Sequence, residues 1–247
     1  MKSTELIMGM PITVEVVGST NETPLKEVFD YFRHVDETFS TYKDESEISR
    51  INRGEISWEE FSPEMKEVFD LSKQTKLETE GYFDIITPQG LYDPSGLVKG
   101  WAIYKAALLL KERNYNRFFI DAGGDVQVSG KNGEGNLWSV GIRHPFEQDK
   151  IVKVLHLTSQ GIATSGTYIR GQHIYNPHQP KRLLTEIVSL TLIGPNVYEA
   201  DRFATAAFAM GRAGINFIER LSGFEGYMID KHGIATQTSG FAKYTQV

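Results

Sequence analysis

The segment EADRFATAAFAMG, residues Glu199–Gly211, carries two oxygen-bearing side chains, Asp201 and Thr205, four positions apart. On a helix that spacing puts both side chains on one face, and the alanines beside them leave room for another backbone or a ligand. A carboxylate and a hydroxyl suit a divalent cation such as Mg²⁺, whose coordination shell substrate phosphates complete. The competing interpretation is a solvated aspartate near a helix start and a threonine bonded back to its own helix.

The composition is that of an ordinary globular protein. The chain has 247 residues, 40% of them hydrophobic and 23% charged, which allows one large domain or two small ones. Its net charge of −6 argues against a general nucleic-acid or anionic-membrane surface, although a local basic pocket stays open. Because there is no cysteine, disulfides, thiolate catalysis and thiolate-bound metals are excluded.

The N-terminus bears on the compartment. The stretch MKSTELIMGMPITVEVVG lacks a basic region followed by a long apolar one, and no run approaches the roughly 20 apolar residues of a membrane span. As given, the chain is therefore expected to have no membrane span and to be cytoplasmic. The alternative is an exported or cell-envelope protein whose signal was removed.

Periodicity and capping residues predict a mixture of helices and strands. In the first half we expect a strand over 12–17, a helix over 23–39, a short helix capped by Ser46, and a helix from Ser62 to about Gly81. In the second half we expect strands on either side of Gly123 and Gly124, a meander over 138–145 and 153–159, and a strand over 187–193. Residues 214–247 are expected to form one helix and two short strands.

Two stretches concentrate polar groups. In GYFDIITPQGLYDPSGLVKGWA, Asp84 and Asp93 flank a short loop, and Lys99 lies in the first turns of a helix whose N-terminus would favour anions. The alternative is an ordinary loop and a lysine that extends to solvent. In DAGGD, Asp121 and Asp125 bracket two glycines, which indicates a bulge, a close ligand or only a structural corner.

Two further side chains are candidates for function. His173 lies in the stretch 161–182, which is read as loop-rich and lies between predicted strands, where functional groups concentrate. Tyr42 precedes a strongly charged turn and is expected at a surface or the mouth of a cleft, where its ring could stack on a planar ligand or simply pack.

Taken together, these segments resemble the ApbE family, the FAD:protein FMN transferases. The resemblance implies an α+β fold of two interleaved subdomains, here a single domain over 1–247, with FAD and Mg²⁺ between them. It covers most of the chain and rests on segments that occur in the family order. These are MGMPITV, FSTYKDESEISRIN, GYFDI, DPSGLVKGWA, DAGGD, GIATSGTYIR, HIYNP and EADRFATAAFAMG.

The resemblance also implies roles for single residues. The metal ligands would be the carbonyl of Gly96 and the side chains of Asp201 and Thr205. His173 would be the catalytic base, and Tyr42 would stack on the flavin. The other positions implied to line the FAD site are Met8, Tyr82, Phe83, Asp84, Asp93, Lys99 and Ile174.

Three departures from the family pattern bear on function. Only Ile86–Tyr92 stands between the GYFDI and DPSG motifs, where the family has a longer insertion, so part of the flavin site would be trimmed or opened. The usual DPxTG is replaced by Asn176–Pro180, which bears on acceptor recognition. The family is typically exported or lipid-anchored, and no signal is recognisable here.

The implied reaction is Mg²⁺-dependent transfer of FMN from FAD to a threonine hydroxyl of a partner protein, with release of AMP. Such chemistry needs mainly positioning and charge neutralisation. A FAD pyrophosphatase, which uses water instead of threonine, is a close alternative. A non-catalytic flavin-binding or carrier protein is an alternative from another class.

Overall fold

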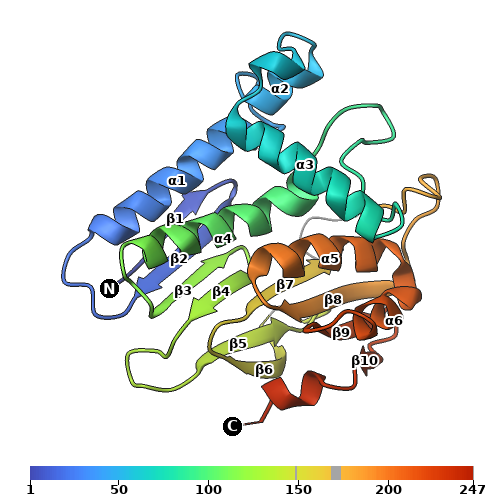
Figure 1. Ribbon diagram of the computed structural model, residues 1–247. Coiled ribbons are helices and arrows are strands. Elements are labelled where there is room, and N and C mark those ends of the chain that lie inside the picture. The colour runs from blue at the N-terminus through green and yellow to red at the C-terminus, as the bar shows by residue number, and fades with distance from the viewer. Residues whose placement is uncertain (148, 168–173, 247) are drawn as a thin grey trace.

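An antiparallel sheet forms the centre of this protein (Figure 1). The computed structural model describes residues 1–147, 149–167 and 174–246. Its strands are β1 (Lys2–Ile7), β2 (Met10–Val16), β3 (Phe118–Ala122), β4 (Asp125–Ser129), β5 (Trp138–Arg143), β6 (Ile151–Leu157), β7 (Gly161–Gly166), β8 (Ile187–Gly194), β9 (Glu225–Asp230) and β10 (Ala235–Gln237). The eight-stranded sheet has the order β1-β2-β3-β4-β7-β8-β9-β10, and β5 pairs with β6 as a separate hairpin.

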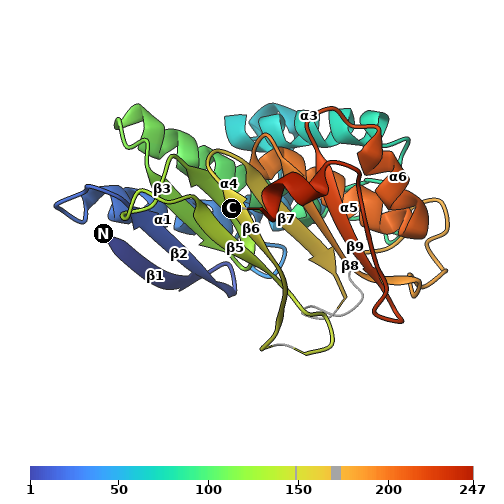
Figure 2. The ribbon, with the colours of Figure 1, turned by 90° about the horizontal axis from the view of Figure 1, so that it is seen from below.

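Helices lie on one face of the sheet (Figures 1 and 2). They are α1 (Thr23–Phe39), α2 (Glu47–Asn52), α3 (Pro63–Glu78), α4 (Ser95–Glu112), α5 (Val197–Ala209) and α6 (Gly214–Glu219), with short 3-10 turns η1 (Trp58–Glu60), η2 (Gly211–Ala213) and η3 (Phe241–Tyr244). The predicted caps are present, since Ser46 and Ser62 each accept a hydrogen bond from a backbone amide of the helix they begin. Gly211 has a φ of 64° just after α5, as expected of a helix stop.

The β5–β6 hairpin covers the opposite face. Residues of β5 alternate strictly between buried and exposed, so Trp138, Val140 and Ile142 pack inward. They join one apolar cluster with Val126 and Val128 of β4 and with side chains of β7, β8 and β9. The strands predicted over 138–145 and 153–159 are thus present, paired with each other and stacked on the main sheet.

The helix-facing core is divided in two. One apolar cluster joins β2 and β3 to α1 and α4 and includes Val197, Tyr198 and Ala206 of α5, and another joins β7, β8 and β9 to α5 and α6. Strand β4 lies between the strands of these two clusters. Its valines pack against the β5–β6 hairpin, and Asp125 and Gln127 face the helices. Its ladder with β7 has two residue pairs. The buried Gln127 side chain adds hydrogen bonds to the same part of the chain, since it accepts from the Val197 amide at 2.9 Å and donates to the Ser159 carbonyl at 3.2 Å.

Two strands differ from the prediction. β1 was not expected, although it pairs with β2 over its whole length through the turn at Met8 and Gly9. The stretch from Gly161, interpreted as loop-rich, begins with β7, which pairs with β4 on one side and β8 on the other. Small polar residues give β7 no alternating apolar pattern, so only its position inside the sheet reveals it as a strand.

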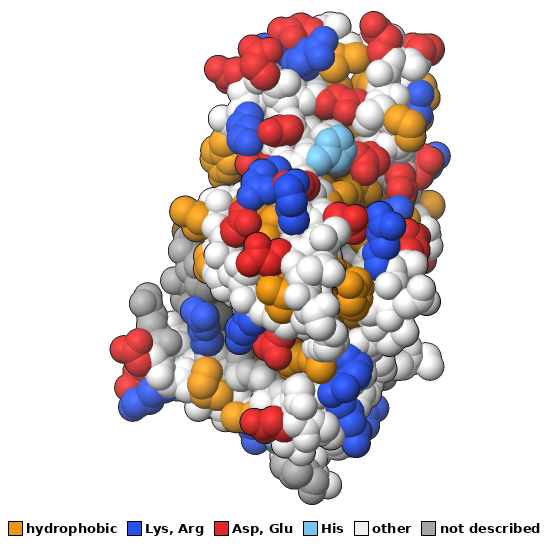
Figure 3. All heavy atoms as spheres, turned by 90° about the vertical axis from the view of Figure 1, so that its left-hand side faces the viewer, with side chains coloured by type: hydrophobic (Ala, Val, Ile, Leu, Met, Phe, Trp, Pro, Cys, Tyr) orange, Lys and Arg blue, Asp and Glu red, His pale blue; other side chains and the backbone are white. Residues whose placement is uncertain are grey.

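The surface fits an acidic protein with a dispersed charge. Acidic and basic side chains are interspersed over the upper part of the face in Figure 3, and several basic side chains gather at its lower right edge. Among the helices of the described ranges, none combines the length and the apolar character that crossing a bilayer requires.

Candidate active site

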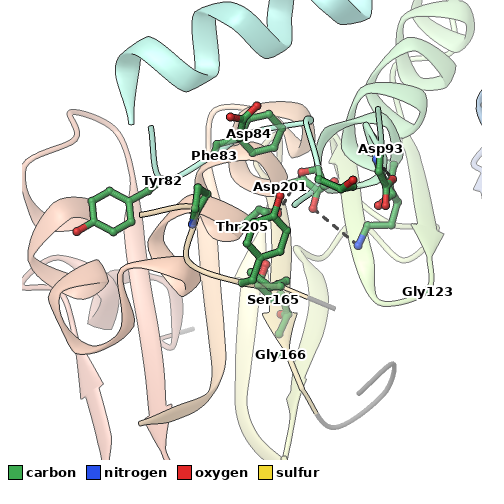
Figure 4. A pocket seen from close by; sticks show the side chains of 17 residues that line it. Tyr82, Phe83, Asp84, Asp93, Gly123, Ser165, Gly166, Asp201 and Thr205 are labelled. Carbon is green, nitrogen blue, oxygen red and sulfur yellow. Dashed lines mark hydrogen bonds and ion pairs between the residues drawn. The ribbon is translucent and has the colours of Figure 1, made fainter. Parts of the chain in front are cut away.

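A pocket opens where the start of α4 meets α5 (Figure 4). Its space, together with the open solvent at its mouth, measures about 1030 Å³. Of the residues singled out from the sequence, it brings together Tyr82, Phe83, Asp84, Asp93, Gly96, Lys99, Ile174, Asp201 and Thr205. The pocket is also lined by residues that were not singled out from the sequence as site residues: Thr87, Ser95, Gly123, Thr164, Ser165, Gly166, Tyr175 and Pro177.

Asp201 lies at the contact between α4 and α5. Its side chain is buried, and its Oδ2 accepts a hydrogen bond of 2.7 Å from the backbone amide of Gly100. Burial raises the pKa of this carboxyl and the nearby Asp125 carboxylate raises it further, whereas Lys99 opposes them. The alternative of a solvated aspartate is therefore excluded, and the group is one that a bound cation would stabilise.

Lys99 places a positive charge between two carboxylates. Its Nζ lies 2.5 Å from Asp125 Oδ2 and 3.8 Å from Asp201 Oδ1, and its side chain is only 16% exposed. The interpretation of a lysine extending to solvent is therefore wrong. Asp125 is held by the Thr164 amide, which donates to its Oδ1 at 3.0 Å. The DAGGD motif was the signal that could have named Asp125 as a site residue.

Thr205 faces the same space as Asp201. Its Oγ1 donates to the carbonyl of Gly96 at 3.1 Å, so its partner lies on α4 and not in its own helix. Gly96 is closely confined, because a Cβ there would lie 3.1 Å from Thr205 Cγ2 and 3.3 Å from the Phe83 ring. A larger residue here would require these side chains to shift by a few tenths of an ångström.

The donor set suits a hard divalent cation. Asp201, Thr205 and Gly96 line the same pocket and offer a carboxylate, a hydroxyl and a carbonyl oxygen, and hard oxygens are the ligands that Mg²⁺ prefers. Among the described residues, no group of three or more His, Cys, Asp or Glu side chains could hold a metal. A cation here would therefore depend on the hydroxyl, the carbonyl and oxygens of a bound substrate.

The GYFD motif forms a wall of the pocket directly after α3. The Phe83 amide donates to Thr79 Oγ1 at 3.1 Å, and Thr79 in turn donates to the Thr75 carbonyl at 2.7 Å. Asp84 pairs with Lys76 of α3 at 2.6 Å. The wall is thus tied to the last turn of α3 by hydrogen bonds as well as by the chain itself.

The short segment between the motifs is a closed turn. Ile86 and Tyr92 form an isolated antiparallel bridge, and Asn52 of α2 bonds both the amide and the carbonyl of Tyr92. Asp93 follows and accepts a 3.0 Å hydrogen bond from the Ser95 amide. The predicted anion-attracting terminus of α4 is therefore already capped in part by a carboxylate of the chain.

The segment Asn176–Pro180 folds back onto this wall. The Nε2 of His178 lies 3.0 Å from the Glu80 carbonyl, and its ring meets that of Tyr82 edge-on at 4.6 Å. The hydroxyl of Tyr175 donates to the Ile86 carbonyl at 3.0 Å. The residues that replace the family's DPxTG thus contact the GYFD motif.

Two sequence-predicted residues lie outside the described lining of the pocket. Met8 stands in the β1–β2 turn with a φ of 56° and packs against the first apolar cluster, outside the described lining of the pocket. Tyr42 precedes α2 and is 96% exposed, in agreement with the expected surface position. His173 falls outside the residues that the structure describes.

A family model described as the ApbE family matches residues 8–91 and 88–228 of this chain. The chain belongs to the ApbE family. Its first curated relatives include the FAD:protein FMN transferase of Escherichia coli strain K12, 30% identical over 160 residues, which covers 61% of this chain and 46% of that protein. The match thus spans about half the length of that ApbE-family relative. A FAD:protein FMN transferase of Haemophilus influenzae is 24% identical over 301 residues, covering 93% of this chain and 86% of that protein.

Solved ApbE structures share the fold. The flavin transferase ApbE from Vibrio cholerae superposes with a TM-score of 0.86 at 20% identity, covering 99% of this chain and 98% of that one. The ApbE protein from Thermotoga maritima gives a TM-score of 0.88 at 18% identity, covering 100% of this chain and 99% of that one. The predicted α+β, ApbE-like fold is therefore confirmed.

Proposed function

We propose that this chain is a Mg²⁺-dependent FAD:protein FMN transferase, which moves FMN from FAD to a threonine hydroxyl of a partner protein. The observation that carries the proposal is the meeting of Asp201, Thr205 and the Gly96 carbonyl with the Lys99 charge in one pocket. The names of the ApbE-family relatives support the same activity.

The transfer is one substitution at phosphorus. The threonine oxygen forms a bond to the phosphorus on the FMN side of the FAD pyrophosphate, the bond from that phosphorus to the bridging oxygen breaks, and AMP leaves with that oxygen. The hydroxyl proton passes to a base, for which we propose His173. A Mg²⁺ ion held by Gly96, Asp201 and Thr205 would neutralise pyrophosphate oxygens and polarise the phosphorus.

Residues of the pocket, with Met8 and Tyr42 from outside its described lining, would bind and orient FAD. Lys99 would lie beside the pyrophosphate, with Asp125 and Asp201 holding its ammonium in place. The proposed FAD-lining set is Met8, Tyr42, Tyr82, Phe83, Asp84, Asp93, Lys99 and Ile174. Fixed charges of this kind lower the barrier because they need not reorganise during the reaction.

His173→Asn is expected to slow FMN transfer strongly while FAD affinity and melting temperature stay near wild type. The reason is that a general base contributes typically 10²- to 10⁴-fold to a rate without being needed for binding. Single-turnover transfer rates, flavin titration and thermal melting of both proteins provide the test. An unchanged rate, or a variant that does not fold, would reject this role for His173.

Tyr42→Ala is expected to weaken FAD binding by about 1–3 kcal/mol, the range measured for stacking of a base on an aromatic ring. The 96% exposure of Tyr42 makes a loss of fold an improbable cause, because the side chain has little packing to lose. Fluorescence titration with FAD measures the effect, and Tyr42→Phe, which keeps the ring, is the control. Equal affinity of the wild type and Tyr42→Ala would place the flavin elsewhere.

The deciding experiment uses FAD, Mg²⁺ and a threonine-containing acceptor domain, with products read by intact mass and AMP by chromatography. The proposal expects the mass of FMN on the acceptor and one AMP for each transfer. Replacement of DPxTG by Asn176–Pro180 is the feature that favours the pyrophosphatase alternative, for which free FMN and AMP would appear with an unmodified acceptor. Bound FAD without Mg²⁺-dependent AMP release would identify a carrier.

A further inference from the structure

Arg202 is a buried cation that the proposed chemistry does not use. It follows Asp201 on α5, its side chain is 5% exposed, and its guanidinium lies 3.9 Å from the centre of the Phe203 ring. Glu199 of the same helix accepts hydrogen bonds from its Nε at 2.9 Å and its Nη2 at 2.6 Å. Burying a guanidinium costs free energy of desolvation unless its N–H groups are hydrogen-bonded. The bonds to Glu199 therefore hold the Arg202 side chain in one orientation.

The same guanidinium joins α5 to the last turns of α3. Its Nη1 donates to Thr75 Oγ1 at 3.2 Å and to the carboxylate of Glu78. α5 thus uses two consecutive residues to bind two other helices, since Asp201 accepts from Gly100 of α4 while Arg202 donates to α3.

The contacted part of α3 supports the wall of the pocket. Thr79, one residue beyond Glu78, bonds the Thr75 carbonyl and the Phe83 amide, and the Phe83 ring lies against Gly96. A continuous set of packed and hydrogen-bonded groups therefore runs from Arg202 through the end of α3 to the GYFD wall and on to the Gly96 carbonyl.

We propose that Arg202 is a positioning residue, which fixes the flavin-pocket wall Tyr82–Asp84 relative to the proposed metal ligands on α5 and thereby couples cation binding to FAD binding. This inference rests on the proposed function, because it requires that FAD and Mg²⁺ share the pocket. A purely structural Arg202 would affect stability and would weaken FAD binding equally with and without the cation.

Glu78→Gln is the sharpest variant, because it removes the charge that Arg202 meets on α3 while leaving Glu199 and Thr75 in place. The Glu78 side chain is 38% exposed, so the fold is expected to survive. Glu67→Gln is the matched control, since Glu67 lies on the same helix, is 39% exposed, and pairs with Lys105 of α4 at 2.8 Å instead of with α5. Arg202→Lys keeps the charge but not the planar fork, and serves as the conservative variant.

The measurement is equilibrium titration with FAD in the presence and absence of Mg²⁺, accompanied by KM for FAD and kcat of transfer. In the wild type and in Glu67→Gln, Mg²⁺ should tighten FAD binding by at least about 5-fold, the low end of common coupling. In Glu78→Gln that factor should fall by about 5-fold, with FAD affinity in the absence of Mg²⁺ unchanged within about twofold. KM for FAD at fixed Mg²⁺ should rise more than kcat falls, and Arg202→Lys should lie between Glu78→Gln and the wild type.

Three results would overturn the inference. If Glu78→Gln has the same coupling factor as the wild type, Arg202 does not couple the two sites, and the proposed function is unaffected. If Glu67→Gln loses coupling to the same extent, the loss comes from any change of charge on α3 and not from the contact between Arg202 and Glu78. A wild-type protein whose FAD affinity does not respond to Mg²⁺ would remove the shared metal site, and this inference with it.

Discussion

Asp201→Asn is expected to lose Mg²⁺-dependent FMN transfer by about 100-fold or more, because Lewis-acid stabilisation is worth several kcal/mol and each 1.36 kcal/mol is tenfold in rate. The asparagine keeps the size of the side chain and an oxygen for the Gly100 amide, so the contact between α4 and α5 should persist. Burial raises the pKa of the Asp201 carboxyl, so the charged form is disfavoured in the metal-free protein. The melting temperature without Mg²⁺ should accordingly stay the same or rise.

Calorimetric titration of FAD with and without Mg²⁺ completes this test. Two side chains and one carbonyl leave several octahedral positions open, so cation and FAD should bind with positive coupling, which must be reciprocal. Asp201→Asn should abolish the coupling while FAD alone still binds. Mg²⁺-dependent turnover and the coupling both intact in Asp201→Asn would mean that the metal lies elsewhere.

Asp230→Asn is the matched control for Asp201→Asn. Asp230 is also buried, but it bonds the His232 and Ile234 amides and pairs with Arg212 at 2.7 Å, away from the described lining of the pocket. Hydrogen bonds from those amides lower the pKa of its carboxyl, so its ionised form stabilises the fold at neutral pH. The control should therefore melt at a lower temperature and keep the coupling, the opposite of what is expected for Asp201→Asn.

Gly100→Ala is expected to lower both stability and activity. A Cβ at this position would lie 2.5 Å from the Asp201 Cβ and 2.8 Å from the Val197 carbonyl, distances at which α4 and α5 must move apart. Overpacking of this kind costs typically about 1–3 kcal/mol. Because the same displacement separates the Gly96 carbonyl from Asp201 and Thr205, FMN transfer should fall well beyond the loss explained by unfolded protein.

Urea unfolding and transfer assays of the folded fraction measure the two effects of Gly100→Ala. Gly133→Ala is the control, because a Cβ at Gly133, in the loop between β4 and β5, would have no neighbour within 4 Å and its φ is not in the left-handed region. The expected change there is within about 0.5 kcal/mol, with full activity. If Gly100→Ala behaved like Gly133→Ala, the close approach of α4 and α5 would not be needed by the site.

The helices could be predicted well from the sequence because their signals are local. Leu25, Val28, Phe29 and the apolar residues that follow recur at helical spacing and are buried in α1, and Ser62 with Pro63 marks the start of α3. β7 could not be predicted in this way. It is a strand because β4 and β8 flank it, and its own residues carry little of that information.

The sequence predicted which residues line the site better than it predicted the contacts that those residues make. Asp201, Thr205 and Lys99 were each singled out as candidates. The alternative interpretation of each assumed that its side chain bonds either to solvent or to its own helix. In the structure the partners come from distant segments: Gly100 for Asp201, Gly96 for Thr205, and Asp125 for Lys99. Such pairs depend on sheet order, which spacing along the chain does not specify.

The narrow ladder between β4 and β7 has a consequence for how the pocket forms during folding. Its two residue pairs and the Gln127 bonds join segments far apart in sequence, and Val197, Tyr198 and Ala206 of α5 complete the apolar cluster of β2, β3, α1 and α4. We expect this junction to be the last part to close and the first to open. The pocket is therefore expected to form only once α4 and α5 have come together, so a ligand bound between these helices would slow their separation.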